Sequence, residues 1–232
     1  MIVILTGAGI SQESGIPTFR DSGGLWENYN IEDVATPTGF RKNPPLVQKF
    51  YNLRRAELLS GNIQPNPAHL ALAKLEDKAK EEVYLVTQNV DDLHERAGSK
   101  NVVHMHGELL KSRCQNCGSI FIQKEDLSVE SICSDCGAKG SLRPHVVWFG
   151  EMPLFMDEIH DALMRADTFI AIGTSGVVYP AAGFVRSTKA KRKIEINREN
   201  SSVSEFFTEK LTGKASEVVV SLVDSLLSTN QR

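Results

Sequence analysis

The sequence predicts an α/β fold, a doubly wound parallel sheet that carries a smaller lobe. Wholly apolar runs at 2–5, 83–87 and 168–172 indicate strands buried on both faces, as in a parallel sheet. Helical patterns separate these runs, which is the alternation that parallel crossovers require. Two stretches, 27–65 and 112–143, show no strand pattern; the first carries prolines and the second all four cysteines. We expect these two stretches to form the smaller lobe.

Composition excludes several classes of protein. The 232 residues, 24% charged and 41% hydrophobic, are ample for a soluble core. A net charge of −3 gives no reason to expect binding to nucleic acid or to a membrane surface. No apolar run is long enough to span a bilayer, and the N-terminus lacks the features of a secretory signal. We therefore expect a cytoplasmic monomer.

The first strand runs into a glycine turn, Thr6-Gly7-Ala8-Gly9-Ile10-Ser11. A strand, a glycine turn and a helix N-terminus bring backbone N–H groups to a pyrophosphate. Gly15 comes too late for the ordinary dinucleotide fingerprint, so a turn without a ligand is the alternative. A second glycine turn at 21–24 ends on Leu25 and Trp26, and we expect it to cover a bound ligand.

The remaining elements follow in order. Before the cysteines we expect helices over 45–59, from Asn66-Pro67 onward and over 91–97, with strands over 83–87 and 102–106. After them we expect strands over 146–149, 168–172 and 193–196, with helices over 153–166, from about 179, and over 215–227. The larger domain then comprises 1–26, 66–111 and 144–232, with 27–65 a helical module and 112–143 a cysteine module.

The cysteines form two pairs, Cys114-x2-Cys117 and Cys133-x2-Cys136, fifteen residues apart. Each pair can place two sulfurs on one cation, and the spacing suits a tetrahedral four-thiolate zinc site. Four thiolates leave no position for water, so the zinc would be structural. The alternatives are a redox dithiol, which needs only one pair, and a nucleic-acid-binding ribbon, which the balanced local charge disfavours.

Polar side chains Gln88, Asn89 and Asp91 follow the strand over 83–87. Ligands of open parallel sheets bind outside the carboxyl ends of the strands, so these groups could bind a ribose and a carboxamide. Helix capping is the alternative for Asn89 and is the favoured interpretation of Asp91 alone.

Two histidines alternate at the end of the strand over 102–106. His104 and His106 would share one face, one reaching the site while the other packs. His106 lies one strand after Gln88, where an imidazole can serve as acid or base. A lone strand histidine is usually structural, and we expect His94 to be a surface or packing residue.

Two later segments could bind an extended peptide between them. One is the apolar strand that ends at Phe149-Gly150-Glu151, and the other is the turn Gly173-Thr174-Ser175. A plain core strand is the alternative for the first. Asn197 follows the strand over 193–196 and could bind an adenosine ribose, or simply form a turn.

Together these residues resemble the sirtuins, the family of NAD-dependent protein-lysine deacylases. The matching motifs occur in family order over nearly the whole chain. They are Gly7-Ala8-Gly9-Ile10-Ser11, Gly15-Ile16-Pro17-Thr18-Phe19-Arg20, Gln88-Asn89-Val90-Asp91, His106-Gly107, the four cysteines, Phe149-Gly150-Glu151 and Gly173-Thr174-Ser175. The resemblance implies a large Rossmann-type domain, with a small lobe made of a helical module and a zinc ribbon.

The resemblance also implies the site residues. NAD would be the co-substrate, with His106 as general base on its ribose and Asn89 assisting catalysis. The cofactor-binding residues would be Gly7, Ala8, Gly9, Ser11, Gly15, Phe19, Arg20, Trp26, Gln88, Asn89, Val90, Asp91, Gly173, Thr174, Ser175, Asn197, Arg198, Glu199 and Ala215. The acylated lysine of a protein, bound as an extended strand, would contact Val147, Phe149, Gly150 and Glu151. The products would be free lysine, nicotinamide and O-acyl-ADP-ribose.

One further match concerns the acyl group. Tyr51 and Arg54 lie three residues apart on the helix over 45–59, hence on one face. In one sirtuin subclass such a pair recognises acidic acyl groups, and a phenol with a guanidinium suits a succinyl or malonyl carboxylate. An ordinary surface helix is the alternative, and we expect Arg55 to be solvated. Other classes also remain open: a non-catalytic NAD-binding platform, or an ADP-ribosyltransferase on the same scaffold.

Overall fold

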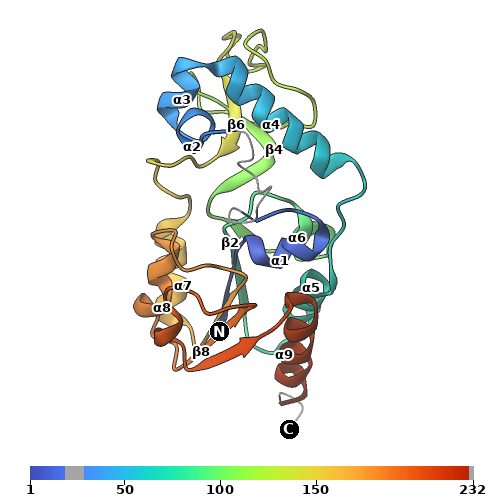
Figure 1. The fold of residues 1–232 in the computed structure, drawn as a ribbon. Helices are drawn as coiled ribbons and strands as arrows, with labels where there is room; N and C mark the ends of the chain where they lie inside the picture. The colour runs from blue at the N-terminus through green and yellow to red at the C-terminus, as the bar shows by residue number, and fades with distance from the viewer. Residues whose placement is uncertain (19–28, 230–232) are drawn as a thin grey trace.

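A parallel six-stranded sheet in the order β3-β2-β1-β7-β8-β9 forms the larger part of the molecule (Figure 1). The computed structural model describes residues 1–18 and 29–229, so the expected covering turn at 21–26 lies outside the described residues. The strands are β1 (Ile2–Thr6), β2 (Val83–Thr87), β3 (Val102–His104), β7 (Thr168–Ile172), β8 (Arg192–Asn197) and β9 (Glu209–Thr212). The predicted doubly wound α/β architecture is confirmed.

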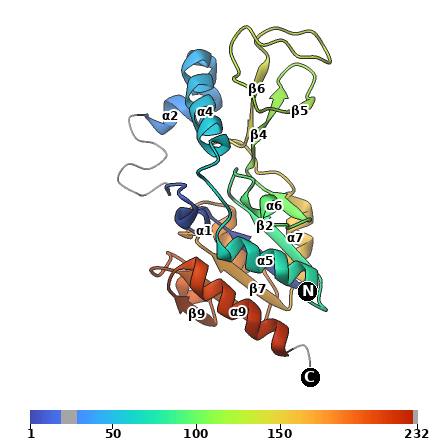
Figure 2. The same ribbon diagram turned by 90° about the vertical axis from the view of Figure 1, so that its right-hand side faces the viewer.

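Helices cover both faces of this sheet, as Figures 1 and 2 show. They are α1 (Ala8–Ser11), α5 (Pro67–Lys78), α6 (Leu93–Arg96), α7 (Met156–Arg165), α8 (Phe184–Ser187) and α9 (Ala215–Thr229), with short 3-10 turns at Gln12–Ser14, Ala181–Gly183 and Ser204–Phe206. No helix among the described residues combines the length and apolarity that crossing a bilayer requires.

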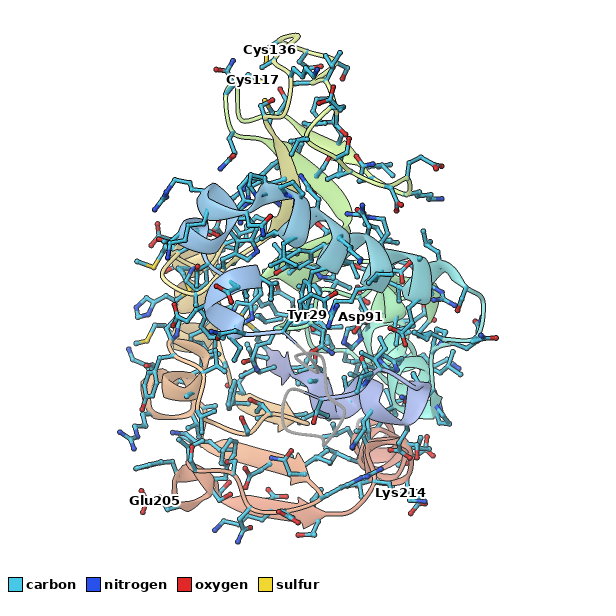
Figure 3. All side chains as sticks on the ribbon, turned by 45° about the horizontal axis from the view of Figure 1, so that its top comes forward. Tyr29, Asp91, Cys117, Cys136, Glu205 and Lys214 are labelled. Atoms are coloured by element: carbon cyan, nitrogen blue, oxygen red, sulfur yellow. The ribbon has the colours of Figure 1, made fainter. Side chains whose placement is uncertain are left out.

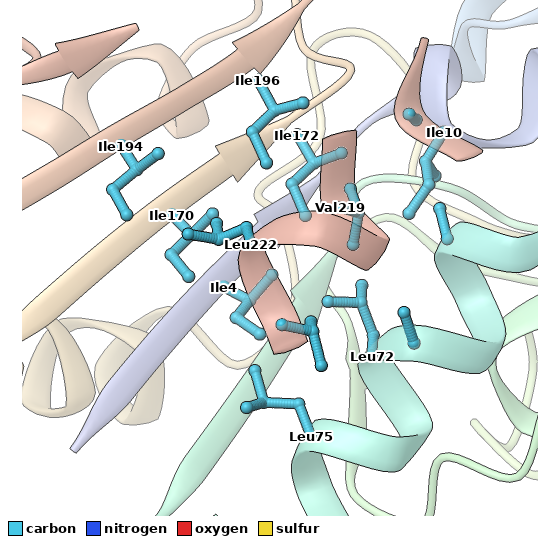
Figure 4. Packing of buried hydrophobic residues seen from close by; sticks show 14 of the residues in the cluster. Ile4, Ile10, Leu72, Leu75, Ile170, Ile172, Ile194, Ile196, Val219 and Leu222 are labelled. Atoms are coloured by element: carbon cyan, nitrogen blue, oxygen red, sulfur yellow. The ribbon is translucent and has the colours of Figure 1, made fainter. Parts of the chain in front are cut away.

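Each face of the sheet buries its own aliphatic cluster. On one face, Ile4, Ile170 and Ile194 pack with residues of α5 and α9 (Figure 4). On the other face, Val3 and Phe169 pack with residues of α7 and α8. Burial on both sides explains why these strands are apolar throughout.

The N-terminus of α5 is closed by Asn66, as its sequence predicts. The Asn66 side-chain oxygen accepts a hydrogen bond from the Ala68 N–H at 2.9 Å, and the Asn66 N–H donates to His69 Nδ1 at 3.3 Å. This reciprocal arrangement is a capping box. The Asn66 side-chain NH2 also donates to the Ile10 carbonyl at 2.7 Å, which ties α5 to the glycine turn.

The smaller lobe combines three helices with an antiparallel sheet. Helices α2 (Ile31–Val34), α3 (Pro37–Lys42) and α4 (Pro44–Leu59) lie beside strands β4 (Gly107–Cys114), β5 (Ile120–Ile122) and β6 (Leu142–Val146), which are ordered β5-β4-β6. Phe40, Phe50 and Trp148 pack in the cluster between the helices and the sheet. This small sheet spans Gly107 to Val146, whereas the boundaries 112–143 expected for the cysteine module stay a prediction.

Two expected strands have different bounds in the structure, and strands β4, β5 and β9 were not predicted. The strand over 102–106 ends at His104, because Met105 and His106 turn before Gly107, whose φ is +80°. The strand expected over 146–149 is β6, which ends at Val146; its Pro144 is tolerated because β6 lies at an edge of its sheet. Strand β9 gave no apolar signal, since half-buried Glu209 and Leu211 alternate with exposed Lys210 and Thr212 at the edge of the larger sheet.

Candidate active site

A cleft of about 770 Å³ opens where the carboxyl ends of the parallel strands face the smaller lobe. Its floor comes from the segments that follow β1, β2, β7 and β8, and its wall from α4 and the segment after β6. This is the position at which open parallel sheets bind ligands.

Two glycine turns meet at the floor of the cleft. The Gly9 N–H donates to the Gly173 carbonyl at 2.9 Å. A Cβ on Gly9 would lie 2.7 Å from Gly173 Cα, and one on Gly7 would lie 2.8 Å from the Gly173 oxygen. Gly173 itself has φ +64°. Ala8, Gly9 and Gly173 line the cleft, so bare backbone is available to a large anionic ligand.

Ser11, Asn89 and Asp91 form a buried polar network beside this turn. The Ser11 hydroxyl donates to Asp91 Oδ2 at 3.0 Å, while Asn89 Nδ2 donates to Ser11 Oγ at 3.1 Å and to the Gly7 carbonyl at 3.2 Å. Burial raises the pKa of Asp91 to about 6, against hydrogen bonds from Leu93 and Ser11 that lower it. Asp91 Oδ1 accepts the Leu93 N–H at 3.1 Å. The N-cap residue of α6 is Asp92, so Asp91 bonds the first helical N–H without being the N-cap.

His106 lines the cleft with a defined tautomer. Its Nδ1 lies 3.0 Å from the Gln88 carbonyl oxygen, which can only accept, so Nδ1 carries the hydrogen. Nε2 of the neutral ring is then the nitrogen with a lone pair. Burial lowers the pKa of His106, which keeps the ring neutral at pH 7. The next residue must be glycine, since a Cβ on Gly107 would overlap the His145 carbonyl.

His104 has a different environment. Its Nε2 pairs with Glu95 Oε1 at 2.6 Å, and Nδ1 lies 3.3 Å from the Asn89 carbonyl. Burial acts to lower the pKa of His104, but the Glu95 carboxylate outweighs burial and raises it. His94 is buried, with Nε2 3.0 Å from Thr6 Oγ1, which makes it a packing residue. Of the three histidines, His106 has the geometry of a base.

The segments after β7 and β8 form the opposite end of the floor. Gln88 Nε2 donates to Thr174 Oγ1 at 3.2 Å, and Asn197 Nδ2 donates to the Thr174 carbonyl at 2.8 Å. Asn197 therefore holds the turn as well as lining the cleft. Ser175, Val90, Arg198, Glu199 and Ala215 line the cleft too. Gly7 and Gly15 do not line the cleft. Phe19, Arg20 and Trp26 lie outside the described residues.

The wall formed by α4 brings Tyr51 and Arg54 to the cleft, on one face as predicted. The Tyr51 hydroxyl accepts a hydrogen bond from Trp148 Nε1 at 2.9 Å, and burial raises the pKa of this phenol. The Arg54 guanidinium carbon lies 3.4 Å from the centre of the Phe50 ring, and Nη1 donates to the Phe50 carbonyl at 3.1 Å. Sequence reasoning missed Trp148, whose only signal was its place in an apolar run.

The segment after β6 lines the same region through Val147, Phe149, Gly150 and Glu151. Phe149 is 52% exposed, which is consistent with a position at the entrance of the cleft. The Glu151 carboxylate instead accepts hydrogen bonds from Arg143 and Arg113 and from the Trp148 N–H. Burial opposes ionisation of Glu151, yet Arg143 lowers its pKa, so this carboxylate braces the segment.

The four cysteines meet at the far tip of the smaller lobe, where Figure 3 labels Cys117 and Cys136. Their sulfurs all lie within 4.8 Å of one another, with Cys114 to Cys136 and Cys117 to Cys133 both at 3.7 Å. Zinc–thiolate bonds of about 2.3 Å in a tetrahedron place sulfurs about 3.8 Å apart. The cluster therefore fits a structural zinc, and its place far from the cleft excludes a direct part in catalysis.

The expectation that Arg55 is solvated was wrong. Arg55 is 1% exposed. Its guanidinium donates to backbone carbonyls of the smaller lobe at Leu109 and Glu125. These acceptors are distant in sequence and have no side-chain signature, so local reasoning could not have found them.

Comparison with known proteins agrees with this geometry. Residues 7–180 match the model of the Sir2 family. An NAD-dependent protein deacylase of Vibrio cholerae is 57% identical over 233 residues, covering 100% of this chain and 95% of its own. An NAD-dependent protein deacylase of Leishmania major is 58% identical, covering 97% of this chain and 95% of its own.

Solved structures agree as well. A Sir2 homologue in complex with NAD has a TM-score of 0.88 at 44% identity, covering 98% of this chain and 90% of its own. A Sir2 protein bound to a propionylated peptide has a TM-score of 0.78 at 31% identity, covering 100% of this chain and 93% of its own. By its motifs, its fold and these relatives, the chain belongs to the Sir2 family, the sirtuins.

Proposed function

We propose that this protein is an NAD-dependent protein-lysine deacylase that accepts acetyl-lysine and acidic acyl-lysines such as succinyl- and malonyl-lysine. The observation that carries the proposal is the lone pair of His106 Nε2, fixed by the Gln88 carbonyl in the cleft that Asn89 and Asp91 also line. A non-catalytic NAD-binding platform would have no need of a neutral imidazole held in this way.

The cleft fits NAD through its glycine cradle and its buried polar network. Bound NAD supplies the electrophilic ribose carbon and nicotinamide as the leaving group. Ala8 and Gly9 offer bare backbone to the pyrophosphate, and Ser175, Asn197 and Ala215 lie toward the adenosine half. Asn89 and Asp91 hold the nicotinamide ribose and carboxamide in place. Positioning of the reactants, more than a protein nucleophile, then accounts for most of the rate.

His106 supplies the base. The acyl oxygen of the lysine would bond to the ribose carbon as the bond to nicotinamide breaks. His106 Nε2 would then take a proton from a ribose hydroxyl, whose oxygen would bond to the acyl carbon. Addition of water would release the lysine amine and leave the acyl group on ADP-ribose. A neutral ring at pH 7 is the form this proton transfer requires, and burial provides it. The target lysine enters past Phe149 and Val147, with its peptide extended beside Gly150. We also propose that the enzyme works as a cytoplasmic monomer without nucleic-acid contacts.

Mass spectrometry of peptide and products tests the activity directly. Incubation with NAD and acetylated or succinylated peptide should release nicotinamide, free lysine peptide and O-acyl-ADP-ribose. A peptide that gains the mass of ADP-ribose would identify a transferase instead. Absence of nicotinamide release would indicate a non-catalytic NAD-binding platform instead of an enzyme.

Arg54→Met tests the acyl preference. Arg54 and Tyr51 line the wall of the cleft. We propose that the acyl chain ends there, since a guanidinium offers paired donors to a carboxylate. A hydrogen bond to a charged group contributes about 1.5–3 kcal/mol, so desuccinylation should fall by about 10- to 100-fold. Deacetylation has no carboxylate to lose and should change far less. Equal losses in kcat/KM for both peptides would refute the assignment.

A further inference from the structure

Helix α4 touches two different parts of the molecule. One face carries Tyr51 and Arg54 to the wall of the cleft. The adjacent face carries Asn52 and Arg55 to the backbone of the smaller sheet and to the loop that follows β5. The two pairs are interleaved in sequence, so any movement of the second pair must move the first.

Asn52 and Arg55 bond to each other and to the backbone of the smaller lobe. Arg55 Nε donates to the Leu109 carbonyl at 3.3 Å, and its Nη1 donates to Asn52 Oδ1 at 2.8 Å and to the Glu125 carbonyl at 3.4 Å. Asn52 Nδ2 donates to the Leu127 carbonyl at 2.8 Å, and the Leu127 N–H donates back to Asn52 Oδ1 at 3.0 Å. Helix α4 is thereby bonded to both β4 and the loop at 125–127.

The composition of these hydrogen bonds is unusual for a surface helix. Arg55 is 1% exposed, and its hydrogen-bond acceptors are two carbonyls and an amide oxygen instead of a carboxylate. A buried charge without a directly paired carboxylate is costly unless its donors are satisfied. Arg55 Nε and Nη1 are satisfied, whereas Nη2 has no partner among the described residues. Lysine cannot replace Arg55, because a single ammonium on a flexible stem cannot reach the carbonyls of Leu109 and Glu125 and the Asn52 side chain together. Packing alone would not require an arginine here.

We propose that Asn52 and Arg55 are positioning residues that hold α4 against the smaller sheet in the register that presents Tyr51 and Arg54 to the acyl end of the cleft. The inference rests on the proposed function, since it deepens the recognition of acidic acyl groups. A misplacement of about 1 Å can reduce a rate about 100-fold where an interaction is directional. A guanidinium–carboxylate contact is directional, whereas an acetyl methyl group tolerates a small shift.

The test compares kcat/KM for succinylated and acetylated peptides in Asn52→Ala and Arg55→Lys. We expect desuccinylation to fall by about tenfold in each variant, with deacetylation little changed. Lys49→Ala, on the exposed face of the same helix, is the matched control and should change neither rate. Equal losses for both peptides in Asn52→Ala and Arg55→Lys would show general damage and would overturn the proposal.

Two further measurements remove the remaining ambiguities. In an Arg54→Met background, Arg55→Lys should cause no further change in the ratio of the two rates, because the Arg54 guanidinium that binds the carboxylate is already gone. Zinc content should stay at that of the unmodified protein; its loss would attribute the effect to collapse of the ribbon and overturn the proposal.

Hydrogen exchange separates failure of this inference from failure of the proposed function. Amides at 51–58 and 125–127 should exchange faster in Asn52→Ala than in Lys49→Ala; unchanged exchange would overturn the inference whatever the substrate. Lack of desuccinylation by the unmodified protein would instead overturn the acyl preference, and exchange would then decide the inference alone.

Discussion

The two sheets of this protein are stabilised by different means. The six-stranded sheet buries aliphatic side chains on both faces, sixteen residues in one cluster alone. The cluster at the tip of the three-stranded sheet has four buried members, Cys114, Leu127, Cys133 and Leu142. Two of these are cysteines of the four-sulfur group. A core of that size cannot offset the conformational entropy of the ribbon. The larger sheet is therefore self-sufficient. The cysteine tip of the smaller sheet depends on the metal, while the other end of that sheet packs against the helical module through Leu109 and Val146.

Removal of zinc should give the largest effect and tests this contrast directly. A structural zinc in a small domain contributes about 10 kcal/mol or more to folding. Treatment with a strong chelator should abolish amide protection in β5 and at the cysteine ends of β4 and β6, while β1 and β7 stay protected in hydrogen exchange. Loss of protection in both sheets together would contradict the division, as would an unaffected ribbon.

Replacement of His106 tests the opposite case, because it removes the general base and leaves both sheets folded. His106→Ala should reduce kcat by about 10²- to 10⁴-fold, the usual contribution of a general base. NAD affinity, measured by calorimetry, should change little. His104→Asn is the matched control, since His104 pairs with Glu95, and it should retain most of the turnover.

The pH profile provides a second check on His106. Burial lowers the pKa of His106, so the neutral base predominates at pH 7. We expect kcat to be constant near neutrality and to fall as the pH drops through this lowered pKa. A profile that already declines above the ordinary histidine range would show that another group limits the reaction.

The contrast also explains what sequence could predict. The strands of the larger sheet are wholly apolar, and the cysteine spacing is specific, so both could be identified from local pattern. Strand β9 could not be identified in this way. It is a half-exposed edge strand, and its charged residues Glu209 and Lys210 are typical of a loop. Arg55 could not either, since its acceptors are backbone carbonyls of Leu109 and Glu125. Prediction failed where a contact depends on the backbone of a distant segment.

The smallest effect concerns acid stability of the larger sheet. His69 of α5 is fully buried next to His94, their ring centres 4.9 Å apart, and burial lowers the pKa of His69 to about 4. The unfolded chain binds the proton near pH 6.5, so stability is complete above that pH and declines as the pH falls toward 4. The loss over this window is about 3 kcal/mol.

His69→Gln isolates this loss, because glutamine can keep the capping box while it removes the titrating ring. Acid also protonates zinc-bound thiolates and destabilises the ribbon, but that loss is common to both proteins and cancels in their difference. The difference in unfolding free energy between variant and unmodified protein should therefore shift in favour of the variant by about 3 kcal/mol from pH 7 to pH 4. Denaturant titration of both proteins at each pH measures this difference. The exposed His160 supplies the control, and His160→Gln should show no such shift. A parallel pH dependence of His69→Gln and the unmodified protein would mean that acid acts on this molecule through the metal lobe alone, and the contrast between the sheets would then extend to their response to pH.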